Sequence, residues 1–288
     1  MEDFVKAGKI ASQAREYGRK LIKPGASLLE VSDKVESKIE SLGGGFGFPT
    51  QISRNVIAAH YCAHPNDETL FEEGDLVKLD LGVHINGSIA DTACTIDLGN
   101  NKELLEASKN ALQNAIKILK PGLPIGQIGR VVQDTITDAG FSPIKNLCGH
   151  GVGKFVVHKE PSIPNFDNGD LTELFDGQII AIEPFASSGV GMIHEVKPAS
   201  VFMQVASKSV RNPITRSILK QIKSYNNLPF TNRWLTKDFS EVKVNFALRD
   251  LLQNNVIRSH GPLKEKRGLV SQHEHTIIIR DKPIVTTL

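Results

Sequence analysis

Two helices near the N-terminus are the first elements that the hydrophobic pattern predicts. The spacing predicts a helix over residues 3–22, which Pro24-Gly25 ends. A second helix follows Ser27, because Ser27 and Glu30 have the spacing of a capping box. Its apolar positions recur at steps of three and four residues, as Leu28, Val31, Val35, Ile39 and Leu42. The second helix therefore presents one apolar face to a core.

The same pattern returns 97 residues further along the chain. Lys120-Pro121-Gly122 repeats Lys23-Pro24-Gly25, and an amphipathic helix over residues 103–119 precedes it. The apolar face of the second helix is repeated as Ile125, Ile128, Val132 and Ile136. This period is too long for a solenoid. It predicts two related halves, each made of a helix pair followed by strands.

Four segments are predicted to be strands. Residues 75–85 and 88–98 flank Asn86-Gly87, the strongest short signal of a hairpin turn. Residues 178–185 and 272–280 are apolar runs typical of buried strands. These strands supply the sheet against which the helix faces would pack.

Residues 208–262 differ in character from the rest of the chain. They are polar, helical in pattern and rich in Lys, Arg and Asn, and they contain the only tryptophan, Trp234. We therefore expect a helical subdomain at 208–262, inserted into a domain made of residues 1–207 and 263–288.

Composition and charge exclude several classes of protein. The 288 residues include 34 Lys and Arg against 32 Asp and Glu, a net charge of +2, and 40% are hydrophobic. A strongly basic nucleic-acid binder and a disordered chain are therefore excluded. Three cysteines are too few for a disulfide framework. No apolar run approaches the roughly 20 residues that span a bilayer. We expect a soluble cytoplasmic protein with no membrane partner and no specific nucleic acid.

Two aspartates of the predicted hairpin carry the first chemical signal. If Asn86-Gly87 is a two-residue turn, Asp80 lies opposite Ala93 and Asp91 lies opposite Gly82. The two carboxylates are then diagonal neighbours on one face, with Cα atoms about 7–8 Å apart. Like charges on a half-buried face repel and lose hydration, so a cation should lie between them. From this hairpin alone, two exposed aspartates beside a turn remain the alternative.

Two glutamates and a histidine extend this signal. Glu183 ends one apolar strand and Glu274 begins another, and a carboxylate at a buried strand end usually has a partner or a metal. His150 lies between glycines, although a lone histidine is more often an exposed loop residue. Four carboxylates and one imidazole suit a pair of Mn, Co, Fe or Zn ions, which activate water and polarise a carbonyl. These segments are far apart in sequence, so the fold has to bring them together.

Residues 75–91 resemble the signature of the type 2 methionine aminopeptidases throughout their length. Five short segments match the same family in its order: Phe48-Pro49-Thr50, Ala58-Ala59-His60-Tyr61, Gly149-His150-Gly151, Ile182-Glu183-Pro184 and Glu274-His275-Thr276. The resemblance covers essentially the whole chain. It implies the α+β pita-bread fold, with two pseudo-symmetric halves around a curved antiparallel sheet. The helical insertion that distinguishes type 2 enzymes would be residues 208–262.

The resemblance also implies a site. Its metal ligands would be Asp80, Asp91, His150, Glu183 and Glu274. Glu183 would also carry a proton from water to the leaving amine. His60 and His158 would bind the peptide and stabilise the developing oxyanion. Phe48 and Val157 would line an apolar pocket for the methionine side chain.

The chain departs from the family pattern beside His60. The family usually reads His-Tyr-Thr-Pro-Asn, whereas this chain reads His60-Tyr61-Cys62-Ala63-His64-Pro65-Asn66. Two histidines therefore compete for one role. We favour His60, because Ala-Ala-His-Tyr is intact and its spacing to Asp80 fits the family.

The implied activity is removal of the N-terminal methionine from nascent proteins whose second residue is small. It would use two divalent ions, with Co, Mn, Fe and Zn all compatible, in a monomer whose partners are nascent N-termini and peptides. A location near the ribosome is compatible with this role. Two alternatives stay open. An X-Pro aminopeptidase or prolidase shares the five ligands but carries an extra N-terminal domain, and a catalytically inactive relative would bind the ribosome or RNA.

Overall fold

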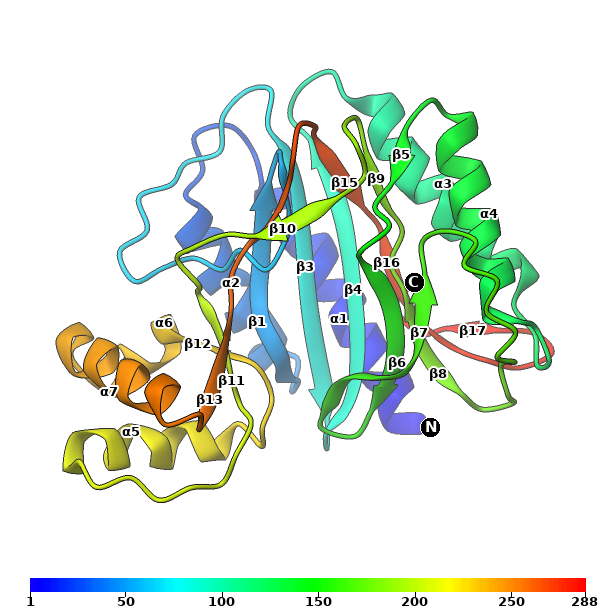
Figure 1. Ribbon diagram of the computed structural model, residues 1–288. Coiled ribbons are helices and arrows are strands. Elements are labelled where there is room, and N and C mark those ends of the chain that lie inside the picture. The colour runs from blue at the N-terminus through cyan, green and yellow to red at the C-terminus, as the bar shows by residue number, and fades with distance from the viewer.

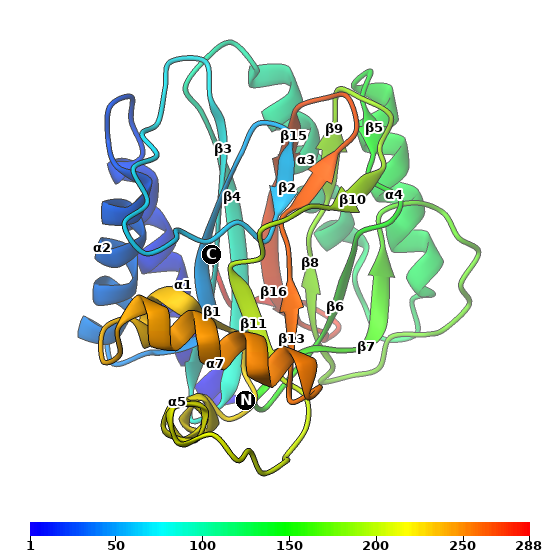
Figure 2. The ribbon, with the colours of Figure 1, turned by 60° about the vertical axis from the view of Figure 1, so that its left-hand side comes forward.

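The structure is a computed structural model that describes residues 1–288. One curved sheet of eight strands forms its centre, in the order β1-β3-β4-β16-β8-β6-β7, with β17 beside β16. All neighbouring strands in this sheet are antiparallel. Helix α1 lies behind β3 and β4 in Figure 1, and helices α5 and α7 form a separate group beside the sheet (Figures 1 and 2).

The first half of the chain supplies three of the strands at one side of this sheet. Its elements are α1 (Glu2–Leu21), α2 (Leu28–Ser41), β1 (Gly45–Arg54), β2 (Ile57–Ala59), β3 (Leu76–Ile85) and β4 (Ser88–Asp97). The predicted helices and hairpin strands are confirmed. The Ser27 side chain accepts a hydrogen bond from the Glu30 N–H at 3.3 Å, so the expected cap starts α2.

The second half repeats the helix pair. Its elements are α3 (Lys102–Ile118), α4 (Ile125–Asp138), β5 (Ser142–Pro143), β6 (Cys148–Gly153), β7 (Val156–Pro164), β8 (Ile179–Ile182) and β9 (Phe185–Ser187). Helix α4 matches α2 residue for residue at the spacing of 97 that the sequence shows. The predicted duplication is therefore confirmed for the helices.

Two predicted strands are interrupted at residues of chemical interest. The strand expected at 178–185 stops at Ile182 and resumes as β9, because Pro184 has no N–H for the ladder. The strand expected at 272–280 divides at His273 into β15 (Val270–Gln272) and β16 (Glu274–Ile278). These two predictions of continuous strands were wrong, and Glu183 lies in one of the breaks.

The remaining elements follow the second half in the chain. They are β10 (Ile193–Glu195), β11 (Val201–Gln204), α5 (Pro213–Ser224), β12 (Phe230–Thr231), α6 (Asn232–Leu235), α7 (Glu241–Gln253), β13 (Ile257–His260), β14 (Leu263–Glu265) and β17 (Ile284–Val285). Strand β11 pairs with both β12 and β13. This small sheet and the helices α5, α6 and α7 share a core of 14 buried residues. None of the helices in the chain has the length and apolarity that a membrane crossing requires.

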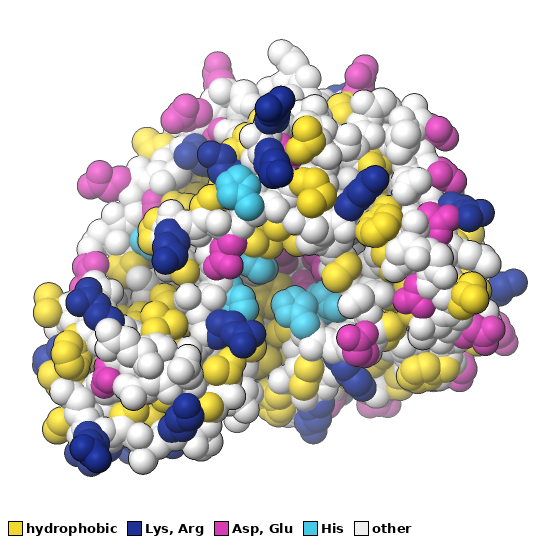
Figure 3. All heavy atoms as spheres, in the orientation of Figure 1, with side chains coloured by type: hydrophobic (Ala, Val, Ile, Leu, Met, Phe, Trp, Pro, Cys, Tyr) yellow, Lys and Arg dark blue, Asp and Glu magenta, His cyan; other side chains and the backbone are white.

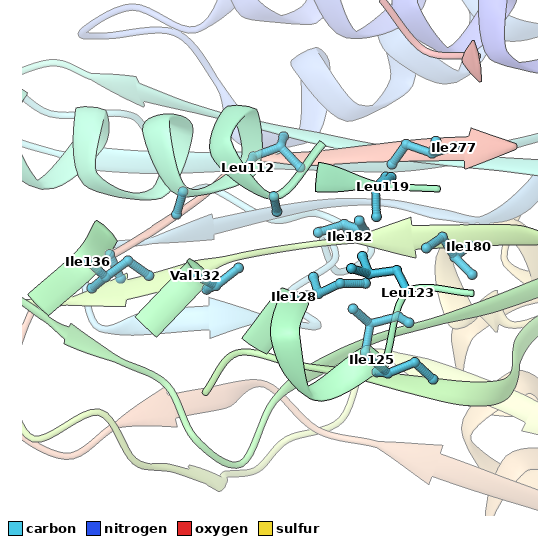
Figure 4. Close-up of a cluster of buried hydrophobic side chains, with 14 of the residues drawn as sticks. Leu112, Leu119, Leu123, Ile125, Ile128, Val132, Ile136, Ile180, Ile182 and Ile277 are labelled. Carbon is cyan, nitrogen blue, oxygen red and sulfur yellow. The ribbon is translucent and has the colours of Figure 1, made fainter. Parts of the chain in front are cut away.

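Each half of the large sheet has its own apolar core. The core of the first half joins α1 and α2 to β3 through residues such as Val35, Leu79 and Leu81. The core of the second half joins α3 and α4 to β8 and β16, and Figure 4 shows Ile128 and Val132 directed towards the strand that carries Ile180 and Ile182. Helix faces therefore cover one side of the sheet, and the other side is left for the site.

A buried ion pair fixes α6 to the first half. Arg233 pairs with Asp33 and, at 2.6 Å, with Glu36 of α2. The other Glu36 oxygen accepts a hydrogen bond from the Trp234 indole N–H at 3.0 Å. The Arg233 and Glu36 side chains are only 5% and 4% exposed. The carboxylate of Glu36 is therefore held by Arg233 and Trp234 of α6, with the Thr50 N–H of β1 as a further donor at 3.4 Å.

We expect Arg233→Met to lower the free energy of unfolding by about 3 kcal/mol, because it leaves the Glu36 carboxylate buried without its cation. Lys237→Met is the matched control. Lys237 is exposed two residues after α6 ends, so its loss should change stability by less than about 0.5 kcal/mol. Urea unfolding followed by circular dichroism measures both. Equal stability of the two variants would contradict the anchoring role.

Candidate active site

A cavity of about 280 Å³ lies over the open side of the large sheet. All nine residues that the sequence singled out line it: Phe48, His60, Asp80, Asp91, His150, Val157, His158, Glu183 and Glu274. Strand β11 and His260 of β13 complete the wall. Figure 3 shows histidine side chains gathered around a hollow on this side of the molecule.

The hairpin of β3 and β4 positions the two aspartates as its register predicted. Asp80 pairs with Ala93 and Asp91 pairs with Gly82. Both aspartates line the cavity, whereas Leu79 and Leu81, on either side of Asp80, belong to the core beneath the helices. Both are buried, so the alternative of exposed aspartates beside a turn is excluded.

Strand β16 joins the two halves and places Glu274 beside these aspartates. Glu274 lies opposite Ala93 of β4. Thr276 accepts a hydrogen bond from the Asp91 N–H at 2.7 Å and donates one to the Asp91 carbonyl at 2.9 Å. Side-chain hydroxyls thus complete the pairing between the halves and fix Asp91 relative to Glu274.

The neighbouring strands of the second half contribute the remaining two groups. His275 of β16 pairs with Ile182, and Glu183 follows directly in the break after β8. On the next strand, β6, His150 pairs with Ala181. Neighbouring strands in one sheet therefore gather five side chains that are up to 194 residues apart in sequence.

The ring orientation of His150 is fixed by its own loop. Its Nδ1 lies 3.1 Å from the Gly151 carbonyl, which can only accept, so Nδ1 carries the hydrogen. Nε2 then directs a lone pair towards Glu183 Oε1 at 3.5 Å and Asp91 Oδ2 at 3.7 Å. Burial, followed by His158, lowers the pKa of His150 to about 3, so the ring is neutral at pH 7. Three electron-rich atoms therefore face one another.

One oxygen of each of three carboxylates lacks a hydrogen-bond partner. Asp80 Oδ1, Asp91 Oδ1 and Glu274 Oε1 are buried and have no hydrogen-bond donor. Burial raises the pKa of Asp80 to about 7. Burial and neighbouring carboxylates raise the pKa values of Asp91, Glu183 and Glu274 well above their usual range. Without cations, this cluster holds its acids in an unfavourable environment.

A divalent metal fits this arrangement. Ligand atoms of Asp91, His150 and Glu274 lie within 4.8 Å of one another. Carboxylate oxygens with one neutral imidazole nitrogen are the donor set that Mn, Co, Fe and Zn accept. The orphaned oxygens and the free Nε2 lone pair are the atoms that such ions bind, so the residues present suit a metal centre.

His60 lies in the cavity and His64 does not. The His60 backbone has a left-handed φ of 67° and its N–H donates to the Gln51 side chain at 2.8 Å. Burial, with His260 and His158 as lesser causes, lowers the pKa of His60 to about 4. His64 lies outside the cavity, with its ring 5.9 Å from that of Tyr61. The position therefore agrees with the choice of His60.

His158 and a histidine that the sequence analysis missed complete this side of the cavity. The His158 ring lies 4.4 Å from that of His150, and the His260 ring lies 6.1 Å from that of His60. His260 belongs to the strand that returns from residues 208–262. It is the first residue of His-Gly-Pro and has no motif around it, so only the tertiary structure places it here.

An apolar wall adjoins the histidines. Phe48 and Val157 are both buried and belong to one cluster with Ile89 and Leu228. The Phe48 ring lies directly over Gly82, where an added Cβ would come within 2.4 Å of it. A side chain at position 82 would therefore displace Phe48 from the cavity wall.

Comparison with known proteins shows the family of this chain. A model of metallopeptidase family M24 matches residues 2–212. Curated methionine aminopeptidases of Pyrococcus horikoshii and Methanocaldococcus jannaschii are each 43% identical to this chain. The alignments cover 100% and 99% of this chain, and 99% and 97% of the relatives.

Solved structures agree on the fold. A methionine aminopeptidase from Thermotoga maritima has a TM-score of 0.73 at 24% identity, covering 99% of this chain and 95% of that one. A thermophilic Arx1 has a TM-score of 0.86 at 17% identity, covering 99% and 90%. A Pyrococcus furiosus prolidase has a TM-score of 0.62 at 21% identity, covering all of this chain but 63% of that one. These confirm the pita-bread fold expected from the sequence. With the full-length relatives, they show that the chain belongs to the methionine aminopeptidases of metallopeptidase family M24.

Proposed function

We propose that the chain removes the N-terminal methionine from peptides whose second residue is small. The observation that carries this proposal is the junction of two surfaces in one cavity. Buried carboxylates around a free imidazole lone pair lie beside an apolar wall that contains Phe48 and Val157. A hydrolytic centre and a pocket for an unbranched apolar side chain are what such a reaction needs.

The charge of the site supports two divalent ions. Asp80, Asp91, Glu183 and Glu274 contribute four negative charges when ionised, and two dications balance them. His150 adds the neutral nitrogen. The bound ions supply a Lewis acid for a peptide carbonyl and lower the pKa of water. Mn, Co, Fe and Zn all accept this donor set, and supply in the cell selects among them.

Glu183 suits the transfer of a proton. Its side chain is 13% exposed, the more open of the two carboxylates that face His150. A carboxylate placed beside the attacking water accepts a proton from it and returns that proton to the leaving amine. We therefore assign Glu183 two roles: it binds metal, and it carries the proton from water to the leaving amine.

His60 and His158 suit hydrogen bonding to the peptide. Burial lowers the pKa of both rings, so each is neutral at pH 7 and has an N–H to donate. Donors held rigidly beside the reacting carbonyl stabilise the charge that develops on its oxygen. The hydrogen bond from His60 N–H to Gln51 fixes the backbone that carries the first ring.

The enzyme would act on N-termini of nascent proteins, in the cytoplasm and as a monomer. We further propose that residues 208–262 form an inserted unit on a domain made of residues 1–207 and 263–288. The inserted unit carries ten Lys and Arg against three Asp and Glu. With a chain total of +2, the remainder has a net charge of −5. This contrast supports a location near the anionic ribosome surface.

Methionine release tests the activity. Protein stripped of metal and reloaded with Mn²⁺ or Co²⁺ should release methionine from Met-Ala-Ser and not from Met-Leu-Ser. Glu183→Gln should lower kcat by about 10²–10⁴-fold, because it removes the proton carrier. Cleavage of Ala-Pro without release of methionine would instead establish the prolidase alternative. Absence of both metal binding and cleavage would establish the inactive relative.

A pair of matched variants tests the choice between the two histidines. His60→Asn should lower kcat/KM by about 10²–10³-fold, since asparagine tolerates the left-handed backbone but loses the imidazole donor. His64→Asn should stay within about twofold of the wild type. Kinetics with Met-Ala-Ser decide the matter, and a larger loss in His64→Asn would reverse the assignment.

Asp80→Asn should stabilise the metal-free protein. Raised carboxyl pKa values mean that the folded state binds more protons than the unfolded state, so metal-free stability falls as pH rises. Between pH 7 and 8, Asp80, with a pKa of about 7, ionises in the folded wild type, and the other titrating groups are common to the wild type and the variant, so their contributions cancel in the comparison. Thermal unfolding in EDTA should therefore show a higher Tm for Asp80→Asn at pH 8 and a smaller fall from pH 7.

Bound metal should reverse the order of the Tm values of the wild type and Asp80→Asn. Mn²⁺ should raise the Tm of the wild type more than that of Asp80→Asn, because the variant has lost a ligand. Asp281→Asn, at an exposed position, is the control and should behave as the wild type in both conditions. A metal-free Asp80→Asn that is less stable than the wild type at pH 8 would contradict the electrostatic account.

A further inference from the structure

The cavity contains an amide side chain that the proposed mechanism does not use. Gln51 of β1 lines the cavity and is only 8% exposed. Its Oε1 accepts a hydrogen bond from the His60 N–H at 2.8 Å. Because a backbone N–H can only donate, this bond identifies Oε1 and leaves Nε2 as the free end of the amide. Nε2 makes no hydrogen bond within the chain and is not sealed from the cavity.

An irregularity in β1 brings Gln51 to the same side of the sheet as Phe48. Phe48 lies opposite Gly82 and Gln51 lies opposite Asp80, so three steps along β1 match two steps along β3. In a regular strand, residues three apart would face opposite sides of the sheet. The extra residue instead lets both side chains line the cavity. Phe48 and Gln51 therefore occupy neighbouring positions on the cavity face, about 7 Å apart.

The apolar wall beside Gln51 offers Nε2 no acceptor. Phe48 and Val157 belong to a cluster of apolar side chains. The other amide of the cavity lining, Asn146, is used at both ends, because its Nδ2 donates to the Ile193 carbonyl and its Oδ1 accepts from the Ile193 N–H. The Gln51 amide is therefore the one in the cavity lining that keeps a free donor.

The residue opposite Gln51 does not use this donor either. Asp80 Oδ1 has no hydrogen-bond donor, and the Asp80 carboxylate is a proposed metal ligand. Gln51 thus lies between the proposed metal centre and the apolar wall that contains Phe48, with a buried N–H that only a bound molecule can pair.

We infer that Gln51 selects methionine by donating its Nε2 hydrogen to the thioether sulfur of the substrate. The inference rests on the proposed function, because it names a contact of the methionine side chain held between Phe48 and Val157. A thioether sulfur is a weak acceptor, whereas the methylene that replaces it in norleucine is none. Norleucine has the same length, so apolar walls bind both side chains. With norleucine bound, the Gln51 donor is covered without a partner, a cost that methionine avoids.

The ratio of kcat/KM values for Met-Ala-Ser and norleucine-Ala-Ser tests this inference in protein reloaded with Mn²⁺. The wild type should favour methionine by about tenfold. Gln51→Met keeps the length of the side chain, and Gln51→Glu keeps an acceptor for the His60 N–H, but both remove the donor. Each should lower the ratio by about fivefold or more. Sulfur also contacts aromatic rings favourably, so Phe48 adds to the wild-type ratio and the variants decide the matter.

Binding gives the same comparison without catalysis. Isothermal titration of L-methionine and L-norleucine into the metal-loaded proteins should show a preference for methionine in the wild type that both Gln51 variants lose. Asn146→Leu is the matched control, because it removes the other amide of the cavity lining. It should keep the wild-type ratio of the two substrates, whatever it does to the individual rates.

Several outcomes would overturn the inference. A ratio that Gln51→Met keeps while both rates fall would mean that Gln51 acts only through the His60 backbone or through Asp80. A ratio that falls in Gln51→Met but not in Gln51→Glu would assign the preference to the acceptor. An equal fall in Asn146→Leu would show only a change in the shape of the cavity. A wild type that cleaves both tripeptides equally overturns this inference alone, whereas one that cleaves neither overturns the proposed function.

Discussion

The burial of four carboxylates at one place in a sheet is the constraint on which the rest of this structure depends. Asp80, Asp91, Glu183 and Glu274 have orphaned or mutually repelling oxygens, and burial raises their pKa values. Such a cluster is stable only if the surrounding structure holds it in place and cations balance it. The same arrangement that destabilises the folded protein without metal therefore favours the binding of divalent ions.

The pairing of β4 with β16 in the middle of the sheet holds the buried carboxylates in place. Strand β4 comes from the first half and β16 from near the C-terminus, and threonine hydroxyls add hydrogen bonds between them. Thr276 bonds both backbone groups of Asp91, and Thr92 bonds the carbonyl of Glu274. Helices α1 to α4 bury the far side of the sheet, so the carboxylates rest on two well-packed cores.

The third core gives the cavity its remaining wall. Arg233 and Trp234 attach α6 to Glu36, and β11 and β13 then contribute Val201, Met203 and His260 to the cavity. Most of the hydrolytic groups thus come from the duplicated halves, whereas part of the cavity wall comes from the segment that follows the second half.

The sequence alone determined the helices, their duplication and the register of the first hairpin, because these depend on local periodicity and on the Asn86-Gly87 turn. The resemblance to a family named the residues that line the cavity. Only the tertiary structure decided that His260 joins them and that β11 contributes Val201 and Met203 to the same cavity. This wall arises where distant segments meet, and no local pattern of residues records such a meeting.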